Sequence, residues 1–246
     1  MKELVPQTTQ TMDKASLPVK HVAVIMDGNR RWASQRKLPK LLGHQEGVKS
    51  LKRLVKHVGA LGLEFLTVYA FSSENWHRAD EEVSYLLKLF VQVLSDEVAE
   101  LHKNKVRLRF IGKLDSMPED LRQKMGRAEE TTRANTGLNL QVAINYGSRL
   151  EITEALKKIA RDTLAGKVEL DDINEDLVSK YLYTSEIPDP ELLIRTGGEM
   201  RLSNYLLWQS AYTEIYICDA LWPDFSPELF DLAIEEFKTR HRRYGS

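Results

Sequence analysis

The sequence has a single cysteine, almost no excess of either charge and no long apolar run, and each of these features argues against a class of protein. The single cysteine, Cys218, excludes an intrachain disulfide, which fits a reducing compartment. The 35 basic and 36 acidic residues give a formal net charge of −1, whereas proteins that bind nucleic acid usually carry a basic excess. No stretch approaches the roughly 18 apolar residues that cross a bilayer. We therefore expect a cytoplasmic protein that does not bind nucleic acid.

The chain reads as a short leader followed by one domain. Residues 1–17 lack the continuous apolar core of a signal peptide and are expected to be a disordered leader. In residues 18–246, apolar runs alternate with helical patterns. The predicted strands are Val22–Met26, Phe65–Ala70, Val106–Ile111, Leu138–Ile144, Leu192–Arg195 and Glu214–Cys218. The predicted helices are Glu46–Leu61, Glu81–Leu101, Pro118–Ala134, Arg149–Leu164, Glu175–Tyr181 and Pro227–Arg240, the last with Ser226 as its N-cap. This alternation predicts a single α/β domain with a central, mostly parallel six-stranded sheet flanked by helices.

Polar segments follow the first five predicted strands. In order they read DGNRRW, FSSENWHR, IGK, NYGSR and RTGGEMR, and all are rich in Gly, Asn, Ser or a basic residue. Ligands of an open parallel sheet bind beyond the carboxyl ends of its strands. We therefore expect these segments to meet at one edge of the sheet and to form the functional site there.

The segment Asp27 to Trp32 combines a carboxylate with groups that bind anions. Gly28 permits close approach of the backbone to a ligand, the first amides of a following helix suit a phosphate, and Arg31 can bind it through two hydrogen bonds. A phosphate repels Asp27 unless a divalent cation lies between them, which favours Mg²⁺. The alternative is an N-cap aspartate beside a basic pair on the surface.

The segment Arg195 to Ser203 places two glycines between two arginines. Backbone N–H groups at Gly197 and Gly198 could form an anion-binding nest. Because no Walker loop and no dinucleotide fingerprint is present, a diphosphate is a better match than a nucleotide. The alternative is an ordinary glycine turn with solvated arginines.

Three further segments have both a structural and a functional interpretation. The helix Glu81–Leu101 is apolar over more than one face, so it belongs to the core or lines a cavity for a hydrocarbon, where larger side chains at Val91 or Ala99 would narrow the space. The acidic run Asp171–Asp176 lies between helices and is interpreted as capping residues. His241–Arg243 can be a cationic helix end.

Several long motifs together resemble the cis-prenyltransferase family of undecaprenyl diphosphate synthases. They are HVAVIMDGNRRWA, GH, YAFSSENWHR, NTGLNLQVAINYGSR, IRTGGEMRLSN and ALWPDF, and the resemblance covers the chain from Leu17 to Gly245. It implies an enzyme that extends an allylic diphosphate, typically farnesyl diphosphate, with isopentenyl diphosphate units through cis double bonds. A long-chain polyprenyl diphosphate such as undecaprenyl diphosphate would be the product, with a peripheral membrane contact for its release.

The resemblance also implies roles for individual residues. Asp27 would be the central catalytic residue and hold Mg²⁺, and Glu214 would complete the metal site from the partner subunit of a homodimer. The primer would be bound by Gly28, Asn29, Arg30, Arg31, Trp32, Lys40, His44, Ser72, Ser73 and Glu74. Asn75, Trp76 and Arg78 would assist condensation, and Arg195, Arg201 and Ser203 would bind isopentenyl diphosphate. Arg243–Gly245 resembles a C-terminal element that reaches a diphosphate across the dimer.

Three residues depart from the commonest form of the family motifs, and some questions stay open. Arg30 and Lys40 stand where many members have Gly and Arg, which bears on primer affinity, and Met200 replaces a histidine that lies near the metal in some members. Asn75 cannot be the final proton acceptor, because the conjugate acid of an amide is far too strong; a diphosphate oxygen or water is easier. The alternatives are a related enzyme of different product length, a non-catalytic partner subunit, or an unrelated phosphate-binding α/β enzyme.

Overall fold

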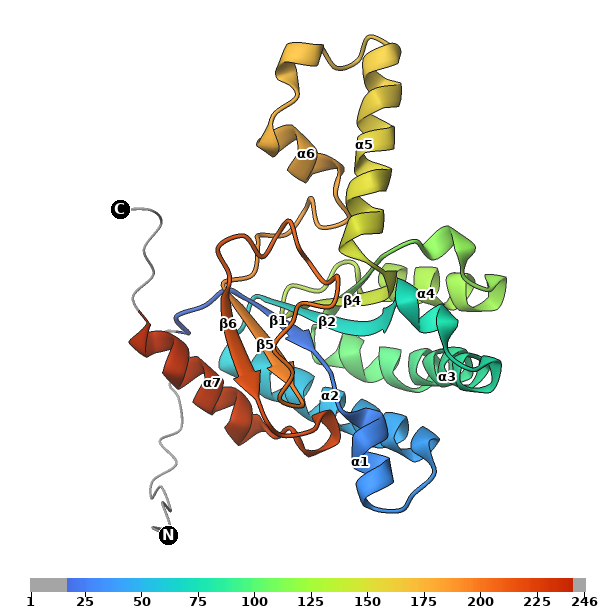
Figure 1. Cartoon of the computed structure of the whole chain (residues 1–246), viewed down its shortest axis with the longest axis vertical. Coiled ribbons are helices and arrows are strands. Elements are labelled where there is room, and N and C mark those ends of the chain that lie inside the picture. The colour runs from blue at the N-terminus through green and yellow to red at the C-terminus, as the bar shows by residue number, and fades with distance from the viewer. Residues whose placement is uncertain (1–16, 241–246) are drawn as a thin grey trace.

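Six parallel strands form one sheet at the centre of the domain (Figure 1). The computed structural model describes residues 17–240. The strands are β1 (His21–Ile25), β2 (Phe65–Ser72), β3 (Arg107–Ile111), β4 (Asn139–Tyr146), β5 (Leu192–Thr196) and β6 (Glu214–Cys218). They lie in the order β3-β4-β2-β1-β5-β6, and all five pairings are parallel. The predicted α/β sheet is confirmed, and it is parallel throughout rather than mostly.

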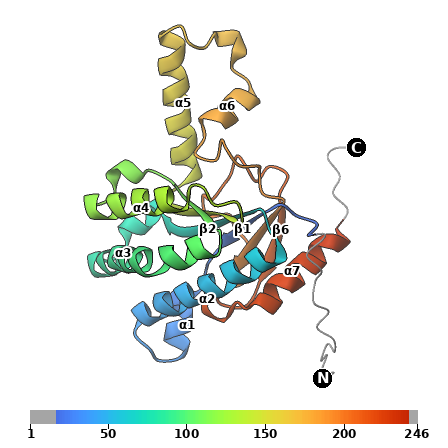
Figure 2. The same cartoon turned by 180° about the vertical axis from the view of Figure 1, so that it is seen from behind.

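Helices cover the sheet unequally on its two faces (Figures 1 and 2). They are α1 (Asn29–Gln35), α2 (Lys40–Leu61), α3 (Asp80–Lys103), α4 (Glu119–Thr132), α5 (Ser148–Leu164), α6 (Glu175–Tyr181) and α7 (Pro227–Thr239). Alternate residues of β1 point to opposite faces, so Val22 and Val24 enter the larger core with α2, α3, α4 and α7. Ala23 and Ile25 enter a smaller core that is rich in tyrosine. The helices α5 and α6 extend away from the sheet as an arm.

The largest differences from the predicted helices lie in the region after β1. Helix α2 begins at Lys40, six residues before the predicted start, and α1 was not among the predicted helices. Glycine has a low helix propensity, but Gly43 and Gly47 lie where α2 packs against the residues after β1. A Cβ at Gly43 would lie 2.0 Å from the Asn29 carbonyl oxygen, and one at Gly47 would lie 2.2 Å from Asn29 Oδ1. These glycines therefore permit close packing instead of ending a helix.

Other predictions on local structure have mixed outcomes. Asn174 caps α6 by accepting a hydrogen bond from Leu177 N, as the capping interpretation of the acidic run requires. Ser226 stands at the N-cap of α7, but its side chain makes no capping hydrogen bond. The predicted leader, apart from Leu17, lies outside the described residues, as do His241–Arg243 and Arg243–Gly245. Within residues 17–240, no helix combines the length and apolarity needed to cross a membrane.

The strand order fixes where a site can form. From β1, the chain places β2, β4 and β3 on one side and β5 and β6 on the other. The loops after β1 and β5 therefore leave neighbouring strands in different directions, which opens a crevice at the carboxyl edge of the sheet. Asp27 lies just beyond β1, and Arg195, on β5, pairs in register with Ile25. These two residues consequently meet at the crevice.

Candidate active site

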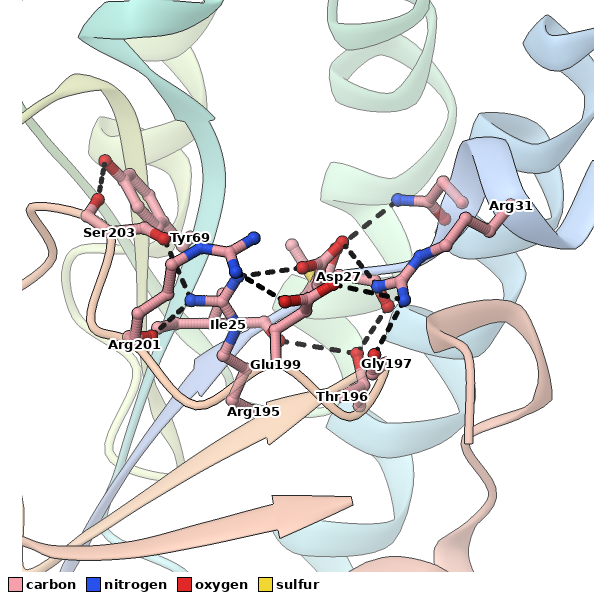
Figure 3. Close-up of polar contacts among 12 residues, drawn as sticks. Ile25, Asp27, Arg31, Tyr69, Arg195, Thr196, Gly197, Glu199, Arg201 and Ser203 are labelled. Carbon is pink, nitrogen blue, oxygen red and sulfur yellow. Dashed lines mark hydrogen bonds and ion pairs between the residues drawn. The ribbon is translucent and has the colours of Figure 1, made fainter. Parts of the chain in front are cut away.

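The Asp27 carboxylate lies between two guanidinium groups (Figure 3). Asp27 Oδ2 accepts a hydrogen bond from Arg195 Nη2 at 2.8 Å, and Oδ1 lies 3.3 Å from Arg31 Nη2. The Asp27 backbone is fixed as well, because its carbonyl oxygen accepts from Thr196 Oγ1 at 2.7 Å and from Trp222 N at 2.9 Å. The buried strand β1 thus delivers a rigidly held carboxylate to the crevice.

Arg195 is a buried cation whose hydrogen bonds are incomplete. Its side chain is only 3% exposed, and its Nη1 donates to Ser203 Oγ at 2.8 Å and to the Arg201 carbonyl oxygen. Its Nε is buried and has no hydrogen-bond partner. Buried donors are normally satisfied, so this unpaired N–H marks Arg195 as an unusual group of the crevice.

The glycine turn after β5 does not form the predicted anion nest. Gly197 N donates to the Ala220 carbonyl oxygen at 2.8 Å, and Gly198 N donates to that of Cys218 at 3.0 Å. Both N–H groups are therefore occupied by backbone carbonyl groups at the end of β6 and just after it. The glycines instead allow Arg31 to approach: its Nη1 donates to the Gly197 carbonyl oxygen at 2.8 Å, and a Cβ at Gly197 would lie 2.4 Å from Nη2. Side chains, rather than these two amides, must supply the charge on this side of the crevice.

A polar pocket of about 500 Å³ opens beside Asp27. Its lining is Met26, Asp27, Gly28, Asn29, Arg30, Arg31, Ser34, Lys40, His44 and Arg78, so most of the predicted primer residues of the first loop and α2 do meet. Trp32 is directed to Asp224 instead, because its Nε1 donates to Asp224 Oδ1 at 2.7 Å. Met200 is 85% exposed. The pocket contains four Arg or Lys side chains and a single carboxylate.

Glu82 is a functional candidate that the sequence did not reveal. Its side chain is 12% exposed and lies 2.8 Å from Arg78, 3.8 Å from Arg30 and 3.6 Å from His44 Nε2. In the sequence it looked like an ordinary acidic residue in the first turn of a helix; only its spacing of four from Arg78 was a signal. Burial lowers the pKa of His44 despite the opposing charge of Glu82. His44 Nε2 is buried and makes no hydrogen bond, with Glu82 Oε1 3.6 Å away.

The segment after β2 forms a short 3₁₀ helix, η1 (Ser73–His77), which is tied to other loops. Asn75 Oδ1 accepts from Ser72 N at 3.1 Å, and Trp76 Nε1 donates to Asn145 Oδ1 at 2.8 Å. Partial burial raises the pKa of Glu74, but hydrogen bonds from Asn204 and from the neighbouring serine hydroxyls outweigh it, and the pKa is lowered. Glu74 is therefore a carboxylate that accepts hydrogen bonds at the crevice.

An apolar cavity of about 570 Å³ lies between α2, α3 and the sheet. Side chains from β2, β3 and β4 form its floor, and α3 forms one wall, as the sequence predicted for this helix. The α3 residues that line it are Phe90, Val93, Leu94, Glu97, Val98, Glu100 and Leu101. The positions chosen from the sequence were wrong, because neither Val91 nor Ala99 is among them and Ala99 is exposed. An ion pair between Lys52 and Glu97 crosses from α2 to α3 at this cavity.

Glu214 and Asp27 are not brought together within the chain. Glu214 pairs in register with Leu192, which pairs with Val22, so Glu214 lies level with the amino end of β1. Five residues of strand separate that level from Asp27, or about 16 Å along the strand. In this chain, Glu214 Oε2 accepts a hydrogen bond from Arg240 Nη1 at 3.0 Å. Among residues 17–240, no group of three or more His, Cys, Asp or Glu side chains is placed to hold a metal ion.

The fold and site thus define an α/β protein with a cationic pocket at the switch point of a parallel sheet and a separate apolar cavity further along α2. A family model described as "Putative undecaprenyl diphosphate synthase" matches residues 25–245. The chain therefore belongs to this family of prenyltransferases.

Similar proteins include isoprenyl transferases from Clostridium perfringens and Brucella suis. They are 49% and 50% identical over 226 residues, which is 92% of this chain and 89% of each relative. A solved structure of lavandulyl diphosphate synthase from Lavandula x intermedia, in complex with dimethylallyl diphosphate, has a TM-score of 0.91 and 35% identity, and covers 94% of this chain and 99% of its own. A probable undecaprenyl diphosphate synthase from Campylobacter jejuni has a TM-score of 0.77 and 34% identity, with coverage of 93% and 99%.

Proposed function

We propose that this prenyltransferase extends an allylic diphosphate, such as farnesyl diphosphate, with isopentenyl diphosphate units to a long-chain cis-polyprenyl diphosphate such as undecaprenyl diphosphate. The observation that carries the proposal is that two unlike cavities are lined by successive turns of α2. Lys40 and His44 line the polar pocket, and Val48 and Leu51, one and two turns further along the helix, line the apolar cavity. A diphosphate head and a hydrocarbon tail of one molecule can thus be bound together.

Two groups of cations suit the two diphosphates of a condensation. The pocket formed by Arg31, Lys40, His44 and Arg78 lies next to the entrance of the apolar cavity and suits the allylic primer. Arg195, Arg201 and Ser203 lie across Asp27 and suit isopentenyl diphosphate, whose short tail needs no cavity (Figure 3). Arginine forks match phosphate geometry well and remain charged at every working pH.

The residues at Asp27 fit Mg²⁺ only in combination with a substrate. Asp27 is a partly exposed carboxylate, but the arginines hold both of its oxygens, and among the described residues it belongs to no group of three or more side chains that could hold a metal ion. Mg²⁺ commonly binds through one or two carboxylates together with substrate phosphates and water. Asp27 would hold the ion against the primer diphosphate, with Glu214 of a second subunit as the further ligand. The ion would neutralise charge on the leaving diphosphate.

The condensation breaks the C1–O bond of the primer and forms a bond from the isopentenyl double bond to C1. Arg31 and Arg78 would stabilise the departing diphosphate, since fixed charges act strongly in a site that excludes water, and His44 could donate a hydrogen bond to it. The C2 proton is then lost to set the new alkene. Asn75 orients this region, but its Oδ1 is occupied by Ser72 N. We therefore assign the final proton acceptor to a diphosphate oxygen or water.

The metal assignment requires a homodimer. Because about 16 Å of strand separates Glu214 from the level of Asp27, a shared metal needs Glu214 from a second copy. The edge strand β6 exposes Ile215, and the arm exposes Leu156, so apolar surface is available on both elements. A closed two-fold dimer would place two complete sites in each molecule. A peripheral contact with the membrane for product release belongs to the same proposal.

The size of the apolar cavity limits what it holds in this conformation. A cavity of about 150 Å³ accepts benzene, or roughly 25 Å³ for each carbon, so about 570 Å³ holds a little over 20 carbons. A longer product requires α2 and α3 to separate. The Lys52–Glu97 pair across them is partly exposed and is worth at most about 1 kcal/mol. Burying one or two methylenes, at about 0.8 kcal/mol each, offsets its loss.

Incubation with farnesyl diphosphate and labelled isopentenyl diphosphate, followed by product sizing, tests this function. We expect label in a series of products that differ by one five-carbon unit, and loss of all products when EDTA removes Mg²⁺. Absence of any labelled product, with Mg²⁺ present, would instead favour a non-catalytic partner subunit. Full activity in EDTA would contradict the role given to Asp27.

A further inference from the structure

The segment that follows Arg201 has a strained backbone. Ser203, Asn204 and Leu206 have φ values of +50°, +61° and +44°, although none is glycine. Such conformations persist only where surrounding contacts hold them, and they gather at functional sites. Ser203 is held by Arg195, as described, and its carbonyl oxygen accepts a hydrogen bond from the Tyr69 hydroxyl at 3.4 Å. The next residue, Asn204, also makes several contacts, and the proposed reaction gives it no role so far.

Asn204 joins the loops that follow three different strands. Its carbonyl oxygen accepts from Ser148 N at 2.8 Å and its Oδ1 accepts from Arg149 N at 2.9 Å, so it holds the beginning of α5. Its Nδ2 donates to Glu74 Oε1 at 2.7 Å. An N–H donor on one side and a carboxylate on the other fix the orientation of the amide.

Gly147 allows these three loops to approach each other so closely. A Cβ at Gly147 would lie 2.7 Å from Asn204 Nδ2 and 2.4 Å from Ser73 Oγ. The side chain of Asn204 is thus enclosed between the loop after β4 and η1. Through Ser203, the same segment reaches Arg195 and, from there, Asp27.

We propose that Asn204 is a positioning residue that holds Glu74 and the Arg195–Ser203 pair at the separation needed for two diphosphates to react. This inference rests on the proposed function. Asn204 does not touch the reacting atoms; it acts through its neighbours, Glu74 on one side and Ser203 on the other. Loss of the Nδ2 donor should therefore weaken binding of isopentenyl diphosphate while leaving the fold intact.

Asn204→Asp separates positioning from a structural role. Aspartate keeps the oxygen that accepts from Arg149 N, tolerates the left-handed backbone and is favourable at a helix start. It replaces the donor that faces Glu74 with an oxygen, so two carboxylates would repel each other. We expect KM for isopentenyl diphosphate to rise about tenfold or more, because a hydrogen bond to a charged group is lost. We expect the melting temperature to stay within a few degrees of wild type.

Reversing the direction of the hydrogen bond between positions 204 and 74 should restore the KM. When Asn204→Asp is combined with Glu74→Gln, the amide introduced on η1 can donate to the carboxylate introduced in the loop after β5. We expect KM to return to within about threefold of Glu74→Gln alone, as coupling between contacting residues requires. Asn139→Asp is the matched control, because Asn139 Nδ2 also donates to an oxygen, that of the Glu64 carbonyl at 3.2 Å, but at the amino edge of the sheet. It should leave KM unchanged.

The outcomes distinguish this inference from the proposed function. If wild type forms no labelled product, the proposed function fails before Asn204 is tested. If wild type is active but Asn204→Asp has the wild-type KM, or if its loss follows a lowered melting temperature and Glu74→Gln gives no rescue, Asn204 is only structural and the positioning role is refuted.

Discussion

The two edges of the sheet differ in the charge of their side chains and in how the buried nitrogens of their histidines are hydrogen-bonded. At the carboxyl edge, charged side chains surround Asp27, buried nitrogens of Arg195 and His44 lack partners, and the backbone around Ser203 is strained. At the amino edge, both ring nitrogens of the buried His21 are paired within the protein, although Gln141 Nε2 in the same network has no partner. His21 Nδ1 lies 2.6 Å from the Pro188 carbonyl oxygen and Nε2 lies 2.7 Å from Thr67 Oγ1. Charged side chains thus gather at the edge where we propose that the diphosphates bind, whereas the buried histidine of the opposite edge is satisfied by the protein itself.

The largest effect should follow from removing the carboxylate at the carboxyl edge. Asp27→Ala should lower turnover by about 10³-fold or more, since it removes the proposed metal ligand and the carboxylate that pairs with two arginines. Single-turnover assays with both diphosphates measure this, and circular dichroism checks that the fold survives. Asp224→Ala is the control, because it removes another partly exposed carboxylate paired with an arginine, Arg36. Turnover of Asp27→Ala near that of wild type would remove the metal assignment.

A mixture of two inactive variants tests whether Glu214, near the amino edge of one subunit, joins Asp27 at the carboxyl edge of another in one active site. Asp27→Ala and Glu214→Ala should each be nearly inactive alone. After statistical subunit exchange, half the dimers are mixed and half of their sites are whole, so about a quarter of wild-type activity should return in a closed two-fold dimer. Exchange verified by mass spectrometry without regained turnover would show that Glu214 acts within its own subunit or not at all.

The amino edge should respond to pH through stability rather than through catalysis. Burial lowers the pKa of His21 from 6.5 to about 4, although its hydrogen bond to Pro188 opposes the shift. The unfolded chain therefore binds the proton more readily between these values. The contribution of neutral His21 to the free energy of unfolding is complete above about pH 6.5. It is lost as the pH falls through about 4, by about 3 kcal/mol in total.

Urea unfolding at pH 7 and pH 4.5 measures this loss. His21→Gln should be less stable than wild type at pH 7 but should lose less stability on acidification. His77→Gln, at an exposed position, is the control and should follow wild type. Equal acid sensitivity of His21→Gln and wild type would contradict a neutral, buried His21.

The sequence predicted the sheet and the meeting of its strand-end loops, because buried strands and polar loop residues are local patterns. It placed β6 at Glu214–Cys218, as observed. It failed where a distant segment decides the outcome. The amides of Gly197 and Gly198 are occupied by the backbone at and just after the end of β6, and Glu82 gains its contacts only because α1, α2 and α3 converge on it. The wrong choice of Val91 and Ala99 has the same origin, since the face of α3 that lines the cavity depends on how it packs.

The apolar cavity extends along α3 from the carboxyl edge toward the amino edge of the sheet. Along α3, Glu82 lies beside the polar pocket, and the Leu101 carbonyl oxygen accepts from the N–H of Val106, which precedes β3 at the amino edge. A growing chain with its diphosphate at the carboxyl edge would therefore extend past Leu94 first and Leu101 later. Seven helical residues separate these two positions, which is about 10 Å of depth.

The most direct test of the account is the product length of Leu94→Trp and Leu101→Trp. Each variant receives farnesyl diphosphate and labelled isopentenyl diphosphate, and both the rate of the first condensation and the final chain length are measured. The account predicts products shorter than wild type, with Leu94→Trp the shorter of the two, while the first condensation stays within a few-fold of wild type. Unchanged lengths, or equal shortening by both variants, would contradict growth of the chain from the carboxyl edge toward the amino edge.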